Sequence, residues 1–266
     1  MASLFRSHFA ACCAAVLACA LTAVGQQSQG LSTAHLRAAV EQLPPKQAVP
    51  KITPELRGDI YMARKMYREA IDMYRQSPDD SAVVQNKTGI AFHQLLQLGI
   101  AKKYYQRSIQ LDPTYSEAIN NLGTVAYAEK NYRKAISYYK RAIKNSDKPA
   151  SVYANLGAAY FARRDYKKAS DYYETALKLD PDVFEHRGGF GTLMQERTIT
   201  ELGLFHLYLA KTYAKSGAND RALIYLRKAL EEGVKDRQKI PDAPEFVSLK
   251  KEPAFQQLLA ENPKPL

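Results

Sequence analysis

A constant spacing of 34 residues is the feature that most constrains the fold of this 266-residue chain. Over residues 82–183 the same residue types recur at this interval. The recurring positions are Gly89, Gly123 and Gly157, then Ala101, Ala135 and Ala169, then Tyr105, Tyr139 and Tyr173. A fixed period of this length predicts a solenoid, in which each unit buries its apolar face only by stacking on its neighbours.

Each unit carries the pattern of two helices joined by a short turn. In residues 116–149, apolar residues three or four positions apart define one face of each helix. They are Ile119, Leu122 and Ala126 in the first helix, and Ala135, Tyr139 and Ala142 in the second. Asn131 and Tyr132 mark the turn between them. The pattern therefore predicts an all-α fold of stacked helix–turn–helix units.

These repeated residues resemble the tetratricopeptide repeat. The residues that carry the resemblance are Asn155-Leu156-Gly157, Tyr160, Ala169, Tyr172-Tyr173, Ala176 and Asp180-Pro181. The tryptophan that is usual in the first helix is replaced by Gln85, Ile119 and Tyr153. The resemblance implies a right-handed α-solenoid of about five repeats with a C-terminal capping segment. It also implies a non-catalytic scaffold that binds another protein or an extended peptide in a concave groove.

The repeats divide the chain into consecutive segments. We expect a signal peptide at 1–25, a flexible proline-containing tether at 26–50, a degenerate repeat 1 at 51–81, repeat 2 at 82–115, repeat 3 at 116–149, repeat 4 at 150–183, an insertion at 184–202, repeat 5 at 203–234 and a C-terminal cap at 235–266. The glycine-rich part of the insertion, 188–191, is interpreted as a flexible connection. An anion-binding loop or a lid over the groove is the alternative.

The N-terminal segment has the features of an export signal. An apolar run at 9–24 follows Arg6 and ends in the small residues of Ala23-Val24-Gly25, which predicts cleavage after Gly25. Alternatives are cleavage at Ala18-Cys19-Ala20, an uncleaved anchor, and a lipoprotein whose lipidated residue is Cys19. All three cysteines lie in this segment, so the mature chain would have none. We expect an exported bacterial protein, periplasmic or associated with the cell envelope.

Motifs of catalysis and metal binding are missing from the sequence. It contains no phosphate-binding loop and no Gly-x-Ser-x-Gly elbow. The histidines beyond residue 25 are His35, His93, His186 and His206, and no two stand three or four residues apart, as a helical metal pair would require. We therefore expect no enzymatic activity, no cofactor and no metal.

The predicted binding groove is lined by inward positions of the first helix of each repeat. These positions are Asn86, Lys87, Ile90, His93, Asn120, Asn121, Thr124, Tyr127, Asn155, Ala158, Phe161, Tyr208 and Lys211. Asn121 and Asn155 are equivalent in successive repeats, and a side-chain amide can pair with any peptide backbone as donor and acceptor. The alternative is that these asparagines serve the packing of the helices.

Charge gives a second interpretation of function. Removing residues 1–25 takes away one basic residue and no acidic one, so the mature charge is 38 − 1 − 27 = +10. A basic balance suits an anionic lipid or a cell-wall polymer, and an exported chain does not meet nucleic acid. The expected partner is a protein or peptide. The alternatives are an anionic envelope surface, or an enzyme complex in which segment 184–202 completes the active site of another subunit.

Overall fold

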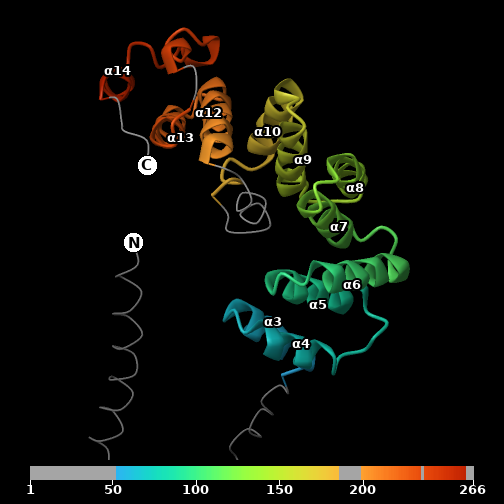
Figure 1. Cartoon of the computed structure of the whole chain (residues 1–266). Helices are drawn as coiled ribbons and strands as arrows, with labels where there is room; N and C mark the ends of the chain where they lie inside the picture. Colours follow the sequence, from blue (N-terminus) through green and yellow to red (C-terminus); the bar gives the residue numbers. More distant parts are fainter. Residues whose placement is uncertain (1–51, 186–198, 235–236, 262–266) are drawn as a thin grey trace, which may run out of the picture. The chain divides into compact units, whose positions relative to one another are not determined.

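The computed structural model describes residues 52–185, 199–234 and 237–261, and within these ranges it contains helices and no β-strand (Figure 1). The helices form consecutive pairs: α3 (Pro54–Ala63) with α4 (Tyr67–Tyr74), α5 (Ala82–Gln94) with α6 (Leu98–Leu111), α7 (Ser116–Ala128) with α8 (Tyr132–Lys144), α9 (Ala150–Ala162) with α10 (Tyr166–Leu179), and α12 (Ile199–Lys215) with α13 (Asn219–Glu231). The second helix of each pair contacts the first helix of the next. The predicted α-solenoid of helix–turn–helix repeats is confirmed.

Some of the predicted segments lie outside the described residues. This is true of the signal peptide and the tether in 1–51, and of 186–198 in the insertion. Helix α12 begins at Ile199, so the end of the predicted insertion belongs to the first helix of the fifth pair. Within the described ranges, no helix is both long enough and apolar enough to cross a membrane.

In the first four pairs, a glycine in the first helix faces a tyrosine ring in the second. The pairs are Gly58 with Tyr74, Gly89 with Tyr105, Gly123 with Tyr139, and Gly157 with Tyr173. A Cβ atom on any of these glycines would lie 2.3 to 2.6 Å from the nearest ring atom. The rings themselves are buried. The recurring glycine and tyrosine of the sequence therefore form one close contact that is repeated from pair to pair.

The turn inside each pair uses a residue in the left-handed backbone region. In the first four turns this residue is Lys65, Leu96, Lys130 or Arg164, with φ between 58° and 62°, and in the fifth it is Gly217 with φ of 81°. The second helix then begins at a capping residue in two of the pairs, where Asn131 and Asp165 accept backbone N–H bonds. Each pair therefore has the same kind of connection between its first and second helix.

Residues 237–261 cover the end of the last pair. They contain η1 (Arg237–Lys239), η2 (Pro244–Phe246) and α14 (Pro253–Ala260). η2 packs against α12, and α14 contacts α13. Phe246 and Phe255 are fully buried, with ring centroids 5.7 Å apart. The segment thus removes from water the apolar surface that an unstacked final repeat would expose.

Candidate functional site

Hydrogen bonds between side-chain amides join neighbouring first helices. Asn121 Nδ2 of α7 donates to Asn86 Oδ1 of α5 at 2.9 Å. Asn155 Nδ2 of α9 donates to Asn120 Oδ1 of α7 at 3.0 Å. Each pair is 35 residues apart, so the same bond is repeated one unit further along. We call these two bonds the amide ladder.

An ion pair takes the place of the next bond, between α5 and α3. Lys87 Nζ lies 2.7 Å from Glu55 Oε1 and 2.7 Å from Asp59 Oδ2. Burial alone would lower the pKa of Lys87, but the hydrogen bonds that its ammonium donates to the two carboxylates outweigh this effect and raise the pKa above its ordinary value. Lys87, a predicted groove residue, therefore already has its partners within the chain.

The amide ladder uses some of the side-chain nitrogen and oxygen atoms of these asparagines and leaves others available to a ligand. Asn86 is fully buried and Asn155 is 2% exposed, so these two amides serve the contact between repeats. Asn121 uses its nitrogen and Asn120 its oxygen in the ladder. Asn121 Oδ1 and Asn120 Nδ2 consequently have no hydrogen-bond partner among the described residues. One acceptor and one donor are thus left on adjacent residues of α7.

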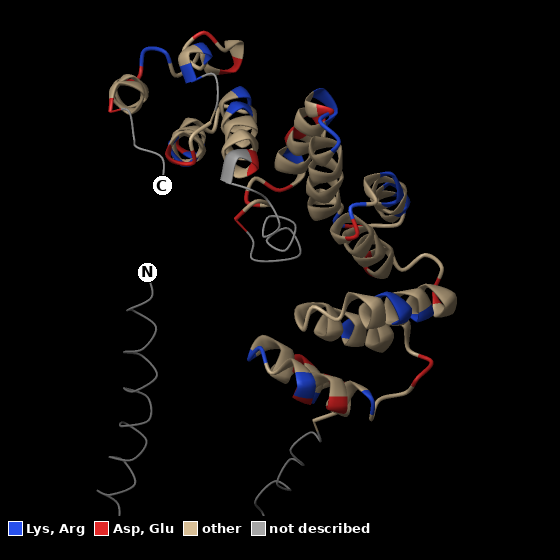
Figure 2. Ribbon diagram, viewed as in Figure 1, with Lys and Arg blue, Asp and Glu red and all other residues tan. Residues whose placement is uncertain are grey.

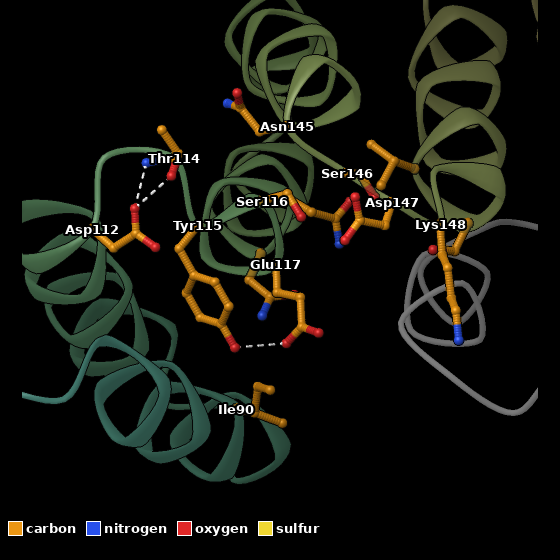
Figure 3. Close-up of a pocket in the computed structure, with 14 residues that line it drawn as sticks. Ile90, Asp112, Thr114, Tyr115, Ser116, Glu117, Asn145, Ser146, Asp147 and Lys148 are labelled. Atoms are coloured by element: carbon orange, nitrogen blue, oxygen red, sulfur yellow. Dashed lines mark hydrogen bonds between the residues drawn. The ribbon is translucent and has the colours of Figure 1, made fainter.

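Asn120 and Asn121 both line a pocket of about 700 Å³, which Figure 3 shows in close-up. We call it the first-helix pocket, and it is lined by Ile90, Asp112, Thr114, Tyr115, Ser116, Glu117, Asn120, Asn121, Asn145, Ser146, Asp147, Lys148, Ser151 and Val152. The lining comes from α5, from the first two turns of α7, from the first turn of α9, and from the two loops that precede α7 and α9. The pocket therefore spans three consecutive repeats.

Acidic groups outnumber basic ones in the first-helix pocket. Three carboxylates, of Asp112, Glu117 and Asp147, stand against the single ammonium of Lys148. Glu117 Oε2 accepts hydrogen bonds from Tyr115 Oη at 3.0 Å and from Asn86 Nδ2 at 3.4 Å. Burial raises the pKa of Tyr115, and the Glu117 charge raises it further, so this hydroxyl stays a donor. The arrangement favours a ligand that brings hydrogen-bond donors or positive charge.

The structure divides the predicted groove residues into three groups. Those that line the first-helix pocket are Ile90, Asn120 and Asn121. Those that are buried are Asn86, His93, Thr124, Tyr127, Asn155, Ala158 and Phe161. The remaining three, Lys87, Tyr208 and Lys211, are neither buried nor in that pocket, and each contacts another side chain of the chain. Tyr208 stacks on Tyr166 with ring centroids 5.0 Å apart. Lys211 Nζ lies 3.4 Å from Glu245 Oε2.

Two of the predicted groove residues, Tyr127 and Phe161, are buried because their rings pack against other rings of the chain. Phe161 of α9 packs edge-on against Phe205 of α12, with ring centroids 5.7 Å apart. Tyr127 packs against Tyr132 at 5.2 Å. These rings therefore have little surface left for a partner. Asp147 and Lys148 belong to the pocket but were not predicted, since they lie in the loop just before the first helix of the next repeat.

A second, smaller pocket of about 330 Å³ lies between α10, α12 and η2. Its lysines are paired: Lys215 Nζ lies 2.6 Å from Glu174 Oε2, beside the contact of Lys211 with Glu245. Hydrogen bonds from Lys215 and Lys178 lower the pKa of Glu174. Its charges are thus matched within the chain, and no cluster of metal-ligating side chains occurs in the described ranges.

The chain is thus a helical repeat protein: it consists of stacked helix hairpins, and a pocket extends over three of them. The sequence profile of the tetratricopeptide repeat matches residues 116–148 and 150–183. The chain therefore contains tetratricopeptide repeats in this region. It is a protein-interaction scaffold, and the family match points to no enzyme.

Individual relatives cover parts of the chain. The solved structure entitled "Functional Characterization of Pseudomonas Aeruginosa pilF" has a TM-score of 0.53 and 17% identity, and the similarity covers 79% of this chain and 86% of that one. At that identity it shows a shared fold. The "Uncharacterized protein ycf37" of Porphyra purpurea is 33% identical over 63 residues, which are 23% of this chain and 36% of that relative.

Proposed function

We propose that the first-helix pocket binds an extended segment of a partner protein. The observation that carries the proposal is the pair of available atoms in the pocket, Asn120 Nδ2 and Asn121 Oδ1. One donor and one acceptor on neighbouring residues match the C=O and N–H groups that an extended backbone presents. Because the ladder bonds hold both amides in place, little side-chain entropy is lost when a ligand binds.

The charge of the pocket bears on the sequence of the segment. Three carboxylates against one ammonium favour a segment with lysine or arginine side chains over an acidic one. A ligand cation near Glu117 would meet an oxygen that is already fixed by Tyr115 and Asn86. The proposed partner therefore offers a stretch of backbone with at least one basic residue.

A substitution that fills the pocket without touching the ladder tests this proposal. Ser151 is exposed on the first turn of α9 and lines the pocket, so Ser151→Tyr places a ring there. Ser137→Tyr is the matched control, because Ser137 is exposed on α8 and lines neither pocket. Replacing Asn121 or Asn155 would be a poorer test, since either change breaks a bond between repeats.

The assay is cross-linked co-purification of the tagged full-length protein from the cells that make it, followed by mass spectrometry. We expect a partner that is recovered with wild type and with Ser137→Tyr and is lost with Ser151→Tyr. Synthetic peptides that cover the cross-linked region of the partner then show whether the bound segment is basic. Recovery of every partner with Ser151→Tyr would refute binding in this pocket.

The location of the protein is part of the proposal, and its support is the sequence of residues 1–25. We propose export to the periplasm or cell envelope with cleavage after Gly25. Intact-mass analysis of the protein from producing cells should give a chain that begins at Gln26. A full-length mass in the cytoplasmic fraction would contradict export, and a lipid attached to Cys19 would replace the cleavage site with the lipoprotein alternative.

A further inference from the structure

Helix α8 carries five basic residues and no acidic one. They are Arg133, Lys134, Lys140, Arg141 and Lys144, and all five are exposed. We call them the α8 cationic face, and the basic residues of this helix are coloured in Figure 2. At 3.6 residues per turn they fall within roughly 120° of the helix circumference and extend along about 16 Å of its axis. The apolar residues of α8 point the other way, into the core.

The chain does not neutralise this face. Within the described residues, no carboxylate forms an ion pair with any of its five members. Arg141 donates a hydrogen bond of 2.6 Å to the backbone oxygen of Pro113, which is an uncharged acceptor. Helix α10 differs, because its Lys168 and Lys178 pair with Asp165 and Glu174.

Part of the charge pattern is unfavourable for the helix that carries it, although Arg141 and Lys144 lie in the last turn, where the helix dipole favours positive charge. Arg133 and Lys134 lie in the first turn, where the helix dipole disfavours positive charge. Lys140 and Lys144 are four residues apart, so their like charges repel. Uncharged polar residues would keep this surface soluble without the unfavourable dipole interaction or the repulsion between lysines. An anionic partner bound to the face would reduce both unfavourable interactions.

The neighbouring second helix extends the positive region. Helix α6 contains Lys102, Lys103 and Arg107 and no acidic residue. Lys102 pairs with Glu129, while Lys103 and Arg107 are exposed and have no ion pair in the described part of the chain. Arg141 ties α8 to the loop that follows α6. Two successive repeats thus present unneutralised cations on their second helices.

We propose that the α8 cationic face binds the surface of an anionic phospholipid bilayer. The five cations spread along the helix and line neither of the two pockets, so they do not converge on a single phosphate. A distributed row of charge matches a surface that carries many phosphates. This site is separate from the first-helix pocket, and a scaffold with both could hold a partner at a membrane.

Vesicle sedimentation with the full-length protein tests the proposal. The vesicles contain 30% phosphatidylglycerol in phosphatidylcholine, and phosphatidylcholine alone measures any binding that does not depend on charge. We expect binding to the anionic vesicles that weakens steeply between 0.05 and 0.5 M salt. Because each near-surface cation strengthens such binding about fivefold, the triple variant Lys134→Gln, Lys140→Gln, Lys144→Gln should bind roughly 100-fold more weakly.

A second triple variant controls for net charge. Arg68→Gln with Lys250→Gln and Lys251→Gln removes three exposed charges from the two ends of the array, and it should bind almost as wild type does. Equal losses in the two triple variants would overturn the assignment to α8, as would equal binding of wild type to both kinds of vesicle. Binding of poly-glutamate through α8 without vesicle binding would also overturn it, in favour of an acidic protein.

Discussion

Replacing Gly157 by alanine tests the packing that underlies every repeat. The new Cβ would lie 2.5 Å from Tyr173 Cε1, 2.6 Å from its Cδ1 and 3.2 Å from the backbone oxygen of Ala169. Tyr173 is 0% exposed, so its ring has no free space to move into. Overpacking of this kind costs typically 1–3 kcal/mol, and contacts this short lie at about the upper end of that range.

Part of that cost is returned by the helix itself. Alanine is favoured over glycine in a helix by about 1 kcal/mol, so the expected net loss for Gly157→Ala is about 1–2 kcal/mol in the free energy of unfolding. Gly99→Ala is the matched control, because its added Cβ has no atom within 4 Å other than those of its chain neighbours and of the nearby backbone of its own helix. That variant should be as stable as wild type or up to about 1 kcal/mol more stable.

Urea unfolding followed by circular dichroism at 222 nm measures both variants. Both substitutions replace glycine by alanine in a helix. Gly157→Ala should lower the free energy of unfolding, whereas Gly99→Ala should leave it unchanged or raise it. If Gly157→Ala proves as stable as wild type, then the close glycine–tyrosine contact is not what holds the two helices of a pair together, and the explanation of the 34-residue pattern is wrong.

Three further predictions concern the ladder, the pH dependence and the cap. Asn121→Ala leaves the buried Asn86 amide oxygen without its donor and should cost about 1–3 kcal/mol in urea unfolding; an unchanged midpoint would mean that the bond contributes nothing. Burial lowers the pKa of His93, so its stability contribution is complete above the unfolded value of about 6.5 and is lost as pH falls toward the folded pKa. His93→Gln should flatten the stability profile between pH 5 and 7.5, and parallel profiles would contradict this. Phe255→Ala should cost about 3–5 kcal/mol and speed proteolysis within 237–261, whereas unchanged digestion would argue against a packed cap.

The fold was predictable because its signal is repeated. Gly123 and Tyr139 would mean little as single residues, but their recurrence at 34 residues indicates a contact that every unit must make. The backbone conformation of the turns was harder to predict from the sequence. Lys130 has the left-handed backbone at that position, and lysine gives no hint of it. Only Gly217, the equivalent residue of the fifth pair, shows the expected residue type.

The candidate site was predictable only in part. The sequence marked Asn121 and Asn155 as equivalent but left open whether they bind a ligand or join the repeats. A side-chain amide can do either, and the outcome depends on the residue it faces. In the structure Asn155 is buried in the ladder, while Asn121 both joins the ladder and lines the pocket. The loop residues of the pocket stand at equivalent positions but change in type between successive units, as Thr114 and Lys148 do, so the repeat pattern could not identify them.

The amide ladder bears on how the array can change in length. Deleting residues 116–149 removes one full period and brings Asn155 to the place of Asn121, opposite Asn86. The same donor then meets the same kind of acceptor, and the glycine–tyrosine contacts stay within their own pairs. Deleting 150–183 would instead place Tyr208 opposite Asn120, where no amide remains to donate. A unit can therefore be lost from the middle of the array without breaking the amide ladder, whereas loss of the fourth unit would leave Asn120 without a donor.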